Sequence, residues 1–270
     1  MKYKSIVLDL DGTLLNSQQK VSPENEQALR DCISNNLDIW VATARPYRLV
    51  FEEKGVLNGL DFLEKKGVFY NGAYASNKVS GYIKHYPIPS NLVSDILGLI
   101  EEVEQDTQVV VQNQEDYHGF RFPNTEIMDW WGFPEEDCIG YPNARRLPCS
   151  KIVVWDESKD LSKLYEMLQE RFSESLNIFI TSSFHWVQIM NKNATKENAL
   201  LDLLSYHGIA PDEVVVFGDD LPDLGMICTF DCSIAMANAR TELKDAAKFT
   251  TSSNDQHGVN YALRELLNLI

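Results

Sequence analysis

Short apolar runs alternate along much of this chain with segments whose apolar residues recur at helical spacing. Apolar runs of strand length occupy 6–8, 37–42, 67–70 and 213–217. Between the first two runs we expect a helix that has Ser22 as its N-cap and Pro23 at its first position. The expected apolar face of this helix consists of Ala28, Leu29, Cys32 and Ile33. Strands that alternate with helices predict an α/β fold with a Rossmann-like parallel sheet.

The middle of the chain has a different pattern. Residues 87–187 contain segments of helical and strand spacing in mixed order, together with an aromatic stretch from Tyr117 to Phe133. After this region the α/β alternation resumes. A module of about a hundred residues lies within the usual size range of a domain. We therefore predict one core domain formed by residues 1–86 and 188–270, interrupted by an inserted α+β domain at 87–187.

Polar residues that could bind a ligand or take part in catalysis follow the predicted strands. Asp9 and Asp11 end the first strand, and because strand side chains alternate, the two carboxylates start on the same side. In open α/β sheets ligands bind beyond the carboxyl ends of the strands. The other polar groups expected at this edge are Thr43, Asn71, Asp219, Asp220 and Lys196. An acidic turn would also explain the first pair, but carboxylates at a buried strand end favour a hard cation such as Mg²⁺.

Hydrolysis of a phosphate monoester needs groups of these kinds. A carboxylate can act as the nucleophile, and a second carboxyl can donate and accept the proton. A metal lets two anions approach each other, while a hydroxyl and an ammonium hold the remaining phosphate oxygens. Thr195 is expected to be a helix N-cap, which brings Lys196 into the first turn. A cation there opposes the helix dipole, so an anion is expected nearby.

Four segments in order resemble the motifs of the haloacid dehalogenase-like superfamily. They are 9–13 (DLDGT), 42–45 (ATAR), 190–196 (MNKNATK) and 218–223 (GDDLPD). Further segments resemble the Cof-type sugar-phosphatase branch: 71–73 (NGA), 235–239 (AMANA) and 251–259 (TSSNDQHGV). The inserted module lies between the second and third motifs, where that branch carries its α/β cap. The resemblance implies a cap that closes over the cleft and selects the leaving group.

The resemblance also implies a role for each matching residue. Asp9 is then the nucleophile and a Mg²⁺ ligand, and Asp11 is the general acid/base that offers its backbone carbonyl to the metal. The implied residues for the phosphate or substrate are Thr43, Lys196, Arg45, Asn71 and Asn254. The implied metal ligands are Asp9, Asp11, Asp219 and Asp223, the last directly or through water. A salt-bridged arginine at a helix start explains Arg45 equally well.

Two positions depart from the family pattern. Ala44 replaces the glycine of the second motif, which is tolerable if its φ is negative. Pro222 replaces the asparagine that precedes the last aspartate of the fourth motif. Proline removes a side-chain amide and a backbone donor, so the surroundings of the metal must differ. Asp220 is one residue that could compensate.

The net charge limits the possible partners, and the cysteine content indicates the cellular compartment. The formal net charge is −16, which argues against nucleic acid and anionic membranes because both need basic surfaces. No apolar run approaches the roughly 20 residues of a membrane span, and the chain enters a strand too early for a signal peptide. The five cysteines are scattered, as expected for reduced thiols. These features predict a cytoplasmic protein.

The expected function is that of a Mg²⁺-dependent phosphatase acting on small phosphorylated metabolites, most of all sugar phosphates, through an aspartyl-phosphate. A phosphomutase would need the same intermediate and return the phosphoryl group to a sugar hydroxyl. A metal- or phosphosugar-binding regulator without turnover is a third interpretation, which only Pro222 supports. The aromatic stretch from Tyr117 to Phe133 could contact the substrate or form a hydrophobic cluster within the cap.

Overall fold

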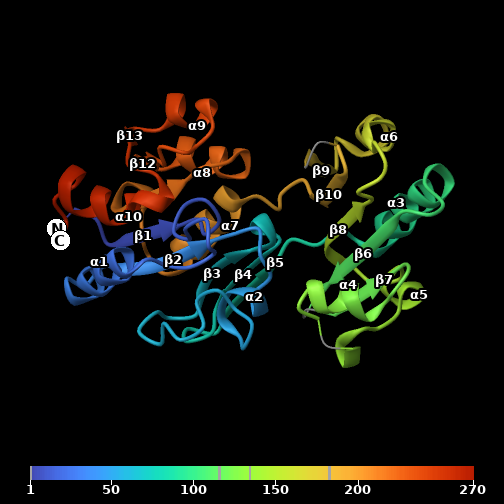
Figure 1. Ribbon diagram of the computed structural model, residues 1–270, viewed down its shortest axis with the longest axis horizontal. Helices are drawn as coiled ribbons and strands as arrows, with labels where there is room; N and C mark the ends of the chain where they lie inside the picture. Colours follow the sequence, from blue (N-terminus) through green and yellow to red (C-terminus); the bar gives the residue numbers. More distant parts are fainter. Residues whose placement is uncertain (1, 115–116, 134, 182–183) are drawn as a thin grey trace. The chain divides into compact units, whose positions relative to one another are not determined.

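The computed structural model describes residues 2–114, 117–133, 135–181 and 184–270, and the chain forms two compact units (Figure 1). Unit 1, the core unit, consists of Met1–Lys84 and Thr195–Ile270, and unit 2, the inserted unit, is His85–Ala194. The second boundary therefore lies after Ala194 rather than after residue 187. The reason is that residues 186–191 form a strand that pairs with two other strands of the inserted unit.

The core unit contains a sheet of eight strands in the order β13-β12-β11-β1-β2-β3-β4-β5. The neighbours from β13 to β3 are parallel, and β4 is antiparallel to β3. This arrangement confirms the predicted Rossmann-like α/β core. In chain order the strands are β1 (Ser5–Leu8), β2 (Asp38–Ala42), β3 (Lys66–Phe69), β4 (Tyr74–Asn77), β5 (Tyr82–His85), β11 (Val214–Gly218), β12 (Cys232–Ala235) and β13 (Phe249–Thr250).

The helices of the core unit connect these strands, as Figure 1 shows. They are α1 (Pro23–Ser34), α2 (Arg48–Phe51), α7 (Lys196–Tyr206), α8 (Leu224–Thr229), α9 (Thr241–Ala246) and α10 (Gly258–Tyr261). The predicted cap of α1 is confirmed, since the Ser22 side chain accepts the N–H of Asn25. Ala28, Leu29 and Cys32 are buried, but Ile33 is exposed, so the predicted apolar face is wrong at that residue.

The inserted unit contains a five-stranded antiparallel sheet in the order β7-β6-β8-β10-β9. Its strands are β6 (Gln108–Asn113), β7 (His118–Phe120), β8 (Cys149–Trp155), β9 (Leu176–Thr181) and β10 (Trp186–Asn191). Its helices are α3 (Ser90–Val103), α4 (Thr125–Trp130), α5 (Tyr141–Ala144) and α6 (Ser162–Phe172). This is the predicted mixture of helices and strands. The antiparallel sheet distinguishes the inserted unit from the core unit, whose sheet is mostly parallel.

The two faces of the inserted sheet have different neighbours. On one face, the apolar sides of α3 and α6 pack against Ile152 and Val154 in one hydrophobic cluster. On the other face, Val153 and Trp155 pack with aromatic residues of the 117–133 stretch, including Phe120 and Phe133. These two rings are buried, whereas Tyr117, Phe122 and Trp130 are exposed. The interpretation as a hydrophobic cluster therefore holds for the buried part of the aromatic stretch.

Two further features follow from the described residues. No helix among them is both long enough and apolar enough to span a membrane. All five cysteines lie within the described ranges and are free thiols, three of them buried. The predicted reduced state of the cysteines agrees with this arrangement.

Candidate active site

Asp9 lies at the carboxyl end of β1, at the centre of the core sheet. All four residues of β1 are buried, and Asp9 itself is only 5% exposed. Its backbone N–H donates to the carbonyl of Phe217 on the neighbouring strand β11 at 3.2 Å. Two adjacent parallel strands therefore bring the segment after Asp9 next to the segment after β11, which carries Asp219.

Gly12 allows these two segments to approach closely. Its φ of +77° is one that L side chains rarely adopt, and a Cβ placed on Gly12 would lie 2.3 Å from Asp219 Oδ2. The next residue, Thr13, is fully buried and donates its hydroxyl to Asp219 Oδ1 at 2.9 Å. Thr13 was not among the predicted site residues. Its position directly after Gly12 in the first motif was the available signal.

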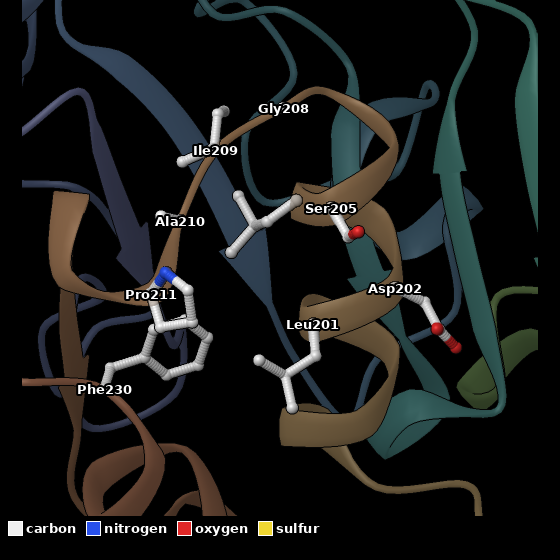
Figure 2. A pocket seen from close by; sticks show the side chains of 9 residues that line it. Leu201, Asp202, Ser205, Gly208, Ile209, Ala210, Pro211 and Phe230 are labelled. Atoms are coloured by element: carbon white, nitrogen blue, oxygen red, sulfur yellow. The ribbon is translucent and has the colours of Figure 1, made fainter.

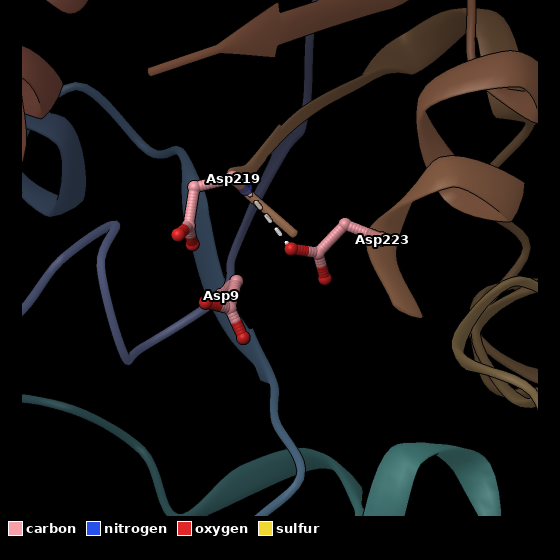
Figure 3. Close-up of side chains that lie close together, drawn as sticks. All are labelled: Asp9, Asp219 and Asp223. Atoms are coloured by element: carbon pink, nitrogen blue, oxygen red, sulfur yellow. Dashed lines mark hydrogen bonds between the residues drawn. The ribbon is translucent and has the colours of Figure 1, made fainter. Parts of the chain in front are cut away.

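Three carboxylates converge at this edge of the sheet. Asp9, Asp219 and Asp223 can each offer one oxygen, and the three oxygens lie within 4.8 Å of one another (Figure 3). Asp9 comes from the end of β1, while Asp219 and Asp223 come from the segment after β11. The sequence placed these three residues in one site, and the structure brings them together.

Lys196 completes the cluster. Thr195 is the N-cap of α7 and accepts the N–H of Asn198, so Lys196 begins the helix as predicted. Its ammonium donates to Asp9 Oδ1 at 2.7 Å and to Asp223 Oδ1 at 2.6 Å, and the lysine is 3% exposed. A charge-assisted hydrogen bond of this length is among the stronger ones in proteins.

Asp223 has partners at both of its oxygens. In addition to the lysine at Oδ1, its Oδ2 accepts the backbone N–H groups of Asp219 at 3.0 Å and Asp220 at 3.2 Å. Pro222 lies at the start of the short helical turn Leu221–Asp223, a position where the missing N–H is not needed. Asp223 thus orders the Asp219 backbone and Lys196 despite the proline, and metal ligation by Asp223 would compete with these contacts.

The charges in the cluster do not balance. When all three carboxylates are ionised, the single ammonium leaves two negative charges uncompensated in the cluster. Burial, opposed by Lys196, raises the pKa of Asp9 well above its usual value, and burial raises the pKa of Asp219 to about 6. Burial lowers the pKa of Lys196, but Asp223 and Asp9 raise it more, and the net shift is upward. A hard divalent cation among oxygen donors would supply the missing positive charge, so the residues fit Mg²⁺.

Asp11 and Arg45 form a pair next to this cluster. Arg45 donates from Nε to Asp11 Oδ2 at 2.8 Å and from Nη2 to Asp11 Oδ1 at 2.6 Å, and Nη2 also contacts Gln19. The two parallel bonds fix the plane of the carboxylate. The structure therefore shows Arg45 in a salt bridge, which was the alternative expectation for this residue, with Asp11 as the partner.

The remaining predicted residues differ in what they contact. Thr43 is fully buried, and its hydroxyl accepts the N–H of Arg45 at 3.2 Å. The backbone N–H of Asn71 donates to the carbonyl of Thr43 at 2.9 Å, which links the ends of β2 and β3. Asn71 has a φ of +53°, and its buried Oδ1 has no hydrogen-bond partner among the described residues. A buried amide oxygen without a partner is unusual in folded proteins.

Asn254 supports the loop that follows Asp9. Its side-chain amide donates to the carbonyl of Leu15 at 2.9 Å, and its backbone N–H donates to Asn238 Oδ1 at 3.0 Å. Asn238 in turn donates to the carbonyl of Gly12 at 2.8 Å. Asn238 lies in the segment 235–239 and was not among the predicted site residues. Both asparagines therefore hold the loop that contains Asp11.

A pocket elsewhere on the core unit has a different character. It has a volume of about 550 Å³ and lies between α7 and the segment that follows it, with Phe230 opposite (Figure 2). Its lining is mainly apolar, and none of the carboxylates described above takes part. This pocket lacks a set of groups that could perform chemistry, so the candidate active site is the carboxylate cluster at the edge of the sheet.

Fold and site together describe an α/β protein with a cluster of carboxylates at the carboxyl edge of a parallel sheet. Comparison with known proteins agrees. Residues 6–263 match the haloacid dehalogenase-like hydrolase family. The chain is 26% identical to the Bacillus subtilis 5-amino-6-(5-phospho-D-ribitylamino)uracil phosphatase YwtE, covering 98% of each chain. It is also 26% identical to phosphatase YwpJ of the same organism, covering 98% of this chain and 100% of that one.

Solved structures show the same similarity. A Thermotoga maritima crystal structure superposes with a TM-score of 0.83 at 27% identity and covers 97% of each chain. A haloacid dehalogenase-like hydrolase from B. subtilis gives a TM-score of 0.78 at 25% identity, covering 97% of this chain and 99% of that one. The chain therefore belongs to the haloacid dehalogenase-like hydrolases, as its motifs suggested.

Proposed function

We propose that this protein is a Mg²⁺-dependent phosphatase that hydrolyses small phosphorylated metabolites through an aspartyl-phosphate on Asp9. The observation that carries the proposal is the buried cluster in which Lys196 donates to Asp9 and Asp223 beside Asp219. The cluster combines a nucleophile, a cation and a set of oxygen donors at one point. Phosphoryl transfer depends mainly on such positioning and charge neutralisation.

Asp9 is the proposed nucleophile. The Lys196 ammonium at 2.7 Å favours the ionised carboxylate and can contact a phosphate oxygen as well. In the first step an Asp9 oxygen forms a bond to phosphorus while the bond from phosphorus to the ester oxygen breaks. The electron pair of that bond leaves with the alcohol. We assign the phosphate oxygens to Lys196, Thr43 and the backbone N–H groups near Thr43.

Asp11 is the proposed general acid and base. It gives its proton to the leaving alcohol in the first step and removes a proton from water in the second. That water attacks phosphorus, which releases inorganic phosphate and restores the Asp9 carboxylate. Arg45 holds the Asp11 carboxyl through two hydrogen bonds, so we assign Arg45 a positioning role rather than direct phosphate binding.

Asp9 and Asp219, together with the backbone carbonyl of Asp11, are the proposed holders of Mg²⁺. When bound, the ion neutralises charge between the Asp9 carboxylate and the phosphate. Because both Asp223 oxygens already have partners, we assign Asp223 to holding Lys196 and the Asp219 backbone.

For the substrate we propose small phosphorylated metabolites, with sugar phosphates first. The YwtE relative acts, by its name, on a phosphorylated ribityl compound. One solved structure with the same fold is described as a sugar phosphatase, at 19% identity and a TM-score of 0.81. We further propose that the inserted unit serves as a cap that selects the leaving group and excludes water, as lids do in many enzymes.

The test is hydrolysis of phenyl phosphate, followed through phosphate release. We expect turnover with Mg²⁺, loss of turnover in EDTA and recovery when excess Mg²⁺ is added. Turnover that persists in EDTA would remove the metal from the scheme. With sugar monophosphates, phosphate should appear in the medium; formation of an isomeric sugar phosphate without phosphate release would instead identify a phosphomutase.

A further inference from the structure

A pocket of about 310 Å³ lies within the inserted unit, and the proposed chemistry at Asp9 does not use it. Its volume is at the lower end of the range for small-molecule sites, which is about 300–1,000 Å³. All of its lining residues belong to the inserted unit. They are Glu126, Ile127, Trp130, Trp155, Glu157 and Trp186.

The antiparallel sheet fixes two of the three indole rings of this pocket. Trp155 ends β8 and Trp186 begins β10, and the two residues are directly opposite in the antiparallel register. Opposite residues on neighbouring strands lie close together on the same face. The two rings are stacked, with centroids 5.5 Å apart and an interplanar angle of 17°. Strand pairing therefore sets this part of the pocket before any ligand binds.

The third indole ring comes from α4. The side chain of Asn124 caps this helix and accepts the N–H of Ile127 at 2.8 Å. Trp130 ends α4, and its ring centroid lies 5.6 Å from that of Trp186. Trp130 is nevertheless 67% exposed. A large apolar side chain that stays in contact with water beside an aromatic hollow is typical of a ligand site.

Two glutamates give this aromatic pocket a negative charge. Glu157 accepts the indole N–H of Trp186 at 2.9 Å, which holds its carboxylate next to the rings. Glu126 lies in the first turn of α4. Among the described residues, neither carboxylate has an ion-pair partner, and no lysine, arginine or histidine lines the pocket. Because indole faces also carry negative potential, the rings and the carboxylates attract the same kind of group, a cation.

We propose that this pocket binds a trialkylammonium group, as carried by choline and similar organic cations. Such a group has no N–H, so its burial leaves no donor unsatisfied, and its methyl groups pack against the indole rings. A primary ammonium is hydrated more strongly and loses more on entering the pocket. The two glutamates repel a phosphate or a carboxylate. The site goes beyond the proposed function and does not depend on it.

The test is calorimetric titration of the full-length protein with choline and with 3,3-dimethylbutan-1-ol, which has the same shape without the charge. We expect choline to bind at least about 10-fold more tightly than the alcohol. Trp130→Leu should weaken choline binding about 10-fold, and the unit should still fold because this side chain is exposed. Glu157→Gln keeps an acceptor for Trp186 but removes the charge, so it should weaken choline binding about 5-fold and leave the alcohol unaffected.

Two control variants lie outside the pocket in the same unit. Phe122→Leu removes an exposed aromatic ring, and Glu170→Gln removes an exposed carboxylate on α6. Both should bind choline as the wild type does. Equal losses in these controls and in the pocket variants would overturn the inference.

Three further results would contradict it: equal affinity for choline and the alcohol, no binding of choline, or a choline affinity unchanged in both Trp130→Leu and Glu157→Gln. Methyl glucoside supplies the last comparison, because neutral sugars also stack on indole rings. Tighter binding of the glucoside than of choline would make the pocket a carbohydrate site and refute the inference. None of these titrations requires hydrolysis of a phosphate ester, so their outcome is separate from that of the proposed function.

Discussion

The core unit and the inserted unit both bury a lysine in contact with a sheet, and the two lysines have opposite environments. Lys196 lies between two carboxylates, and its pKa is raised. Lys151 has no partner among the described residues, and burial lowers its pKa to about 8. The fold therefore supplies a counter-charge for Lys196 and, among the described residues, none for Lys151, which lies on β8 and is 7% exposed.

The largest expected effect is on catalysis at the site where Lys196 is paired with Asp9 and Asp223. Asp9→Asn removes the nucleophile but keeps the size of the side chain, so phenyl phosphate hydrolysis should fall about 10³-fold or more. Circular dichroism should show an unchanged fold. Asp61→Asn, an exposed aspartate of the same unit, is the control and should keep wild-type activity. Turnover by Asp9→Asn near the wild-type rate would discredit the assigned nucleophile.

The next effect is on stability without metal. Lys196→Met leaves Asp9 and Asp223 buried without their cation, and in EDTA the free energy of unfolding should fall by about 3–5 kcal/mol. Urea denaturation measures the change. Lys4→Met breaks an exposed pair with Glu213 and should change the free energy by about 0–1 kcal/mol. Equal losses for the two variants would show that burial of the Lys196 pairs does not matter.

Lys151→Met should raise the free energy of unfolding, whereas Lys196→Met lowers it. Because the pKa of Lys151 is about 8 when folded and about 10.5 when unfolded, the unfolded chain binds more protons between these values. The lysine therefore destabilises the fold fully below pH 8, and this penalty disappears as the pH rises towards 10.5. At pH 7 the variant should be more stable than wild type by about 1–3 kcal/mol.

The measurement is the difference in unfolding free energy between wild type and Lys151→Met, taken from urea curves across this pH range. Groups common to both proteins cancel in the difference. A constant difference between pH 7 and pH 10.5 would show that the Lys151 charge is not destabilising.

The smallest expected effect concerns Arg45. Arg45→Lys replaces two parallel hydrogen bonds to Asp11 with one point charge, so kcat should fall about 10-fold while KM changes little. Arg30→Lys, in an exposed helix pair with Glu26, serves as control. A rise in KM alone would instead place Arg45 on the phosphate.

Much of the core could be predicted from the sequence because strand ends follow directly from apolar runs. Asp9 and Asp219 directly follow apolar strands, and Lys196 begins a helix. Parallel pairing of β1 and β11 brings the ends of the two strands together. The contacts of Arg45 and Asn254 could not be predicted, because they depend on how loops fold between strands. Lys151 was not recognised either, since a lysine within an apolar run gives no sign of whether a partner faces it.

The boundary of the inserted unit shows a similar limit. The segment near 186–191 is apolar enough to form a strand of either unit. Only its pairing with β8 and β9 assigns it to the inserted unit. Strand pairing is a long-range property that one sequence does not specify locally. The surroundings of Pro222 could not be predicted either, because no spacing rule predicts the contacts that Asp223 makes.

The central claim, that Asp9 carries the phosphoryl group, can be tested by one rapid-quench measurement. Wild-type protein is mixed with ³²P-labelled phenyl phosphate in Mg²⁺, stopped in acid within one turnover and digested. We predict an acid-stable, hydroxylamine-sensitive label on the peptide that contains Asp9. Turnover with no label on that peptide, or with the label on another residue, would contradict the account.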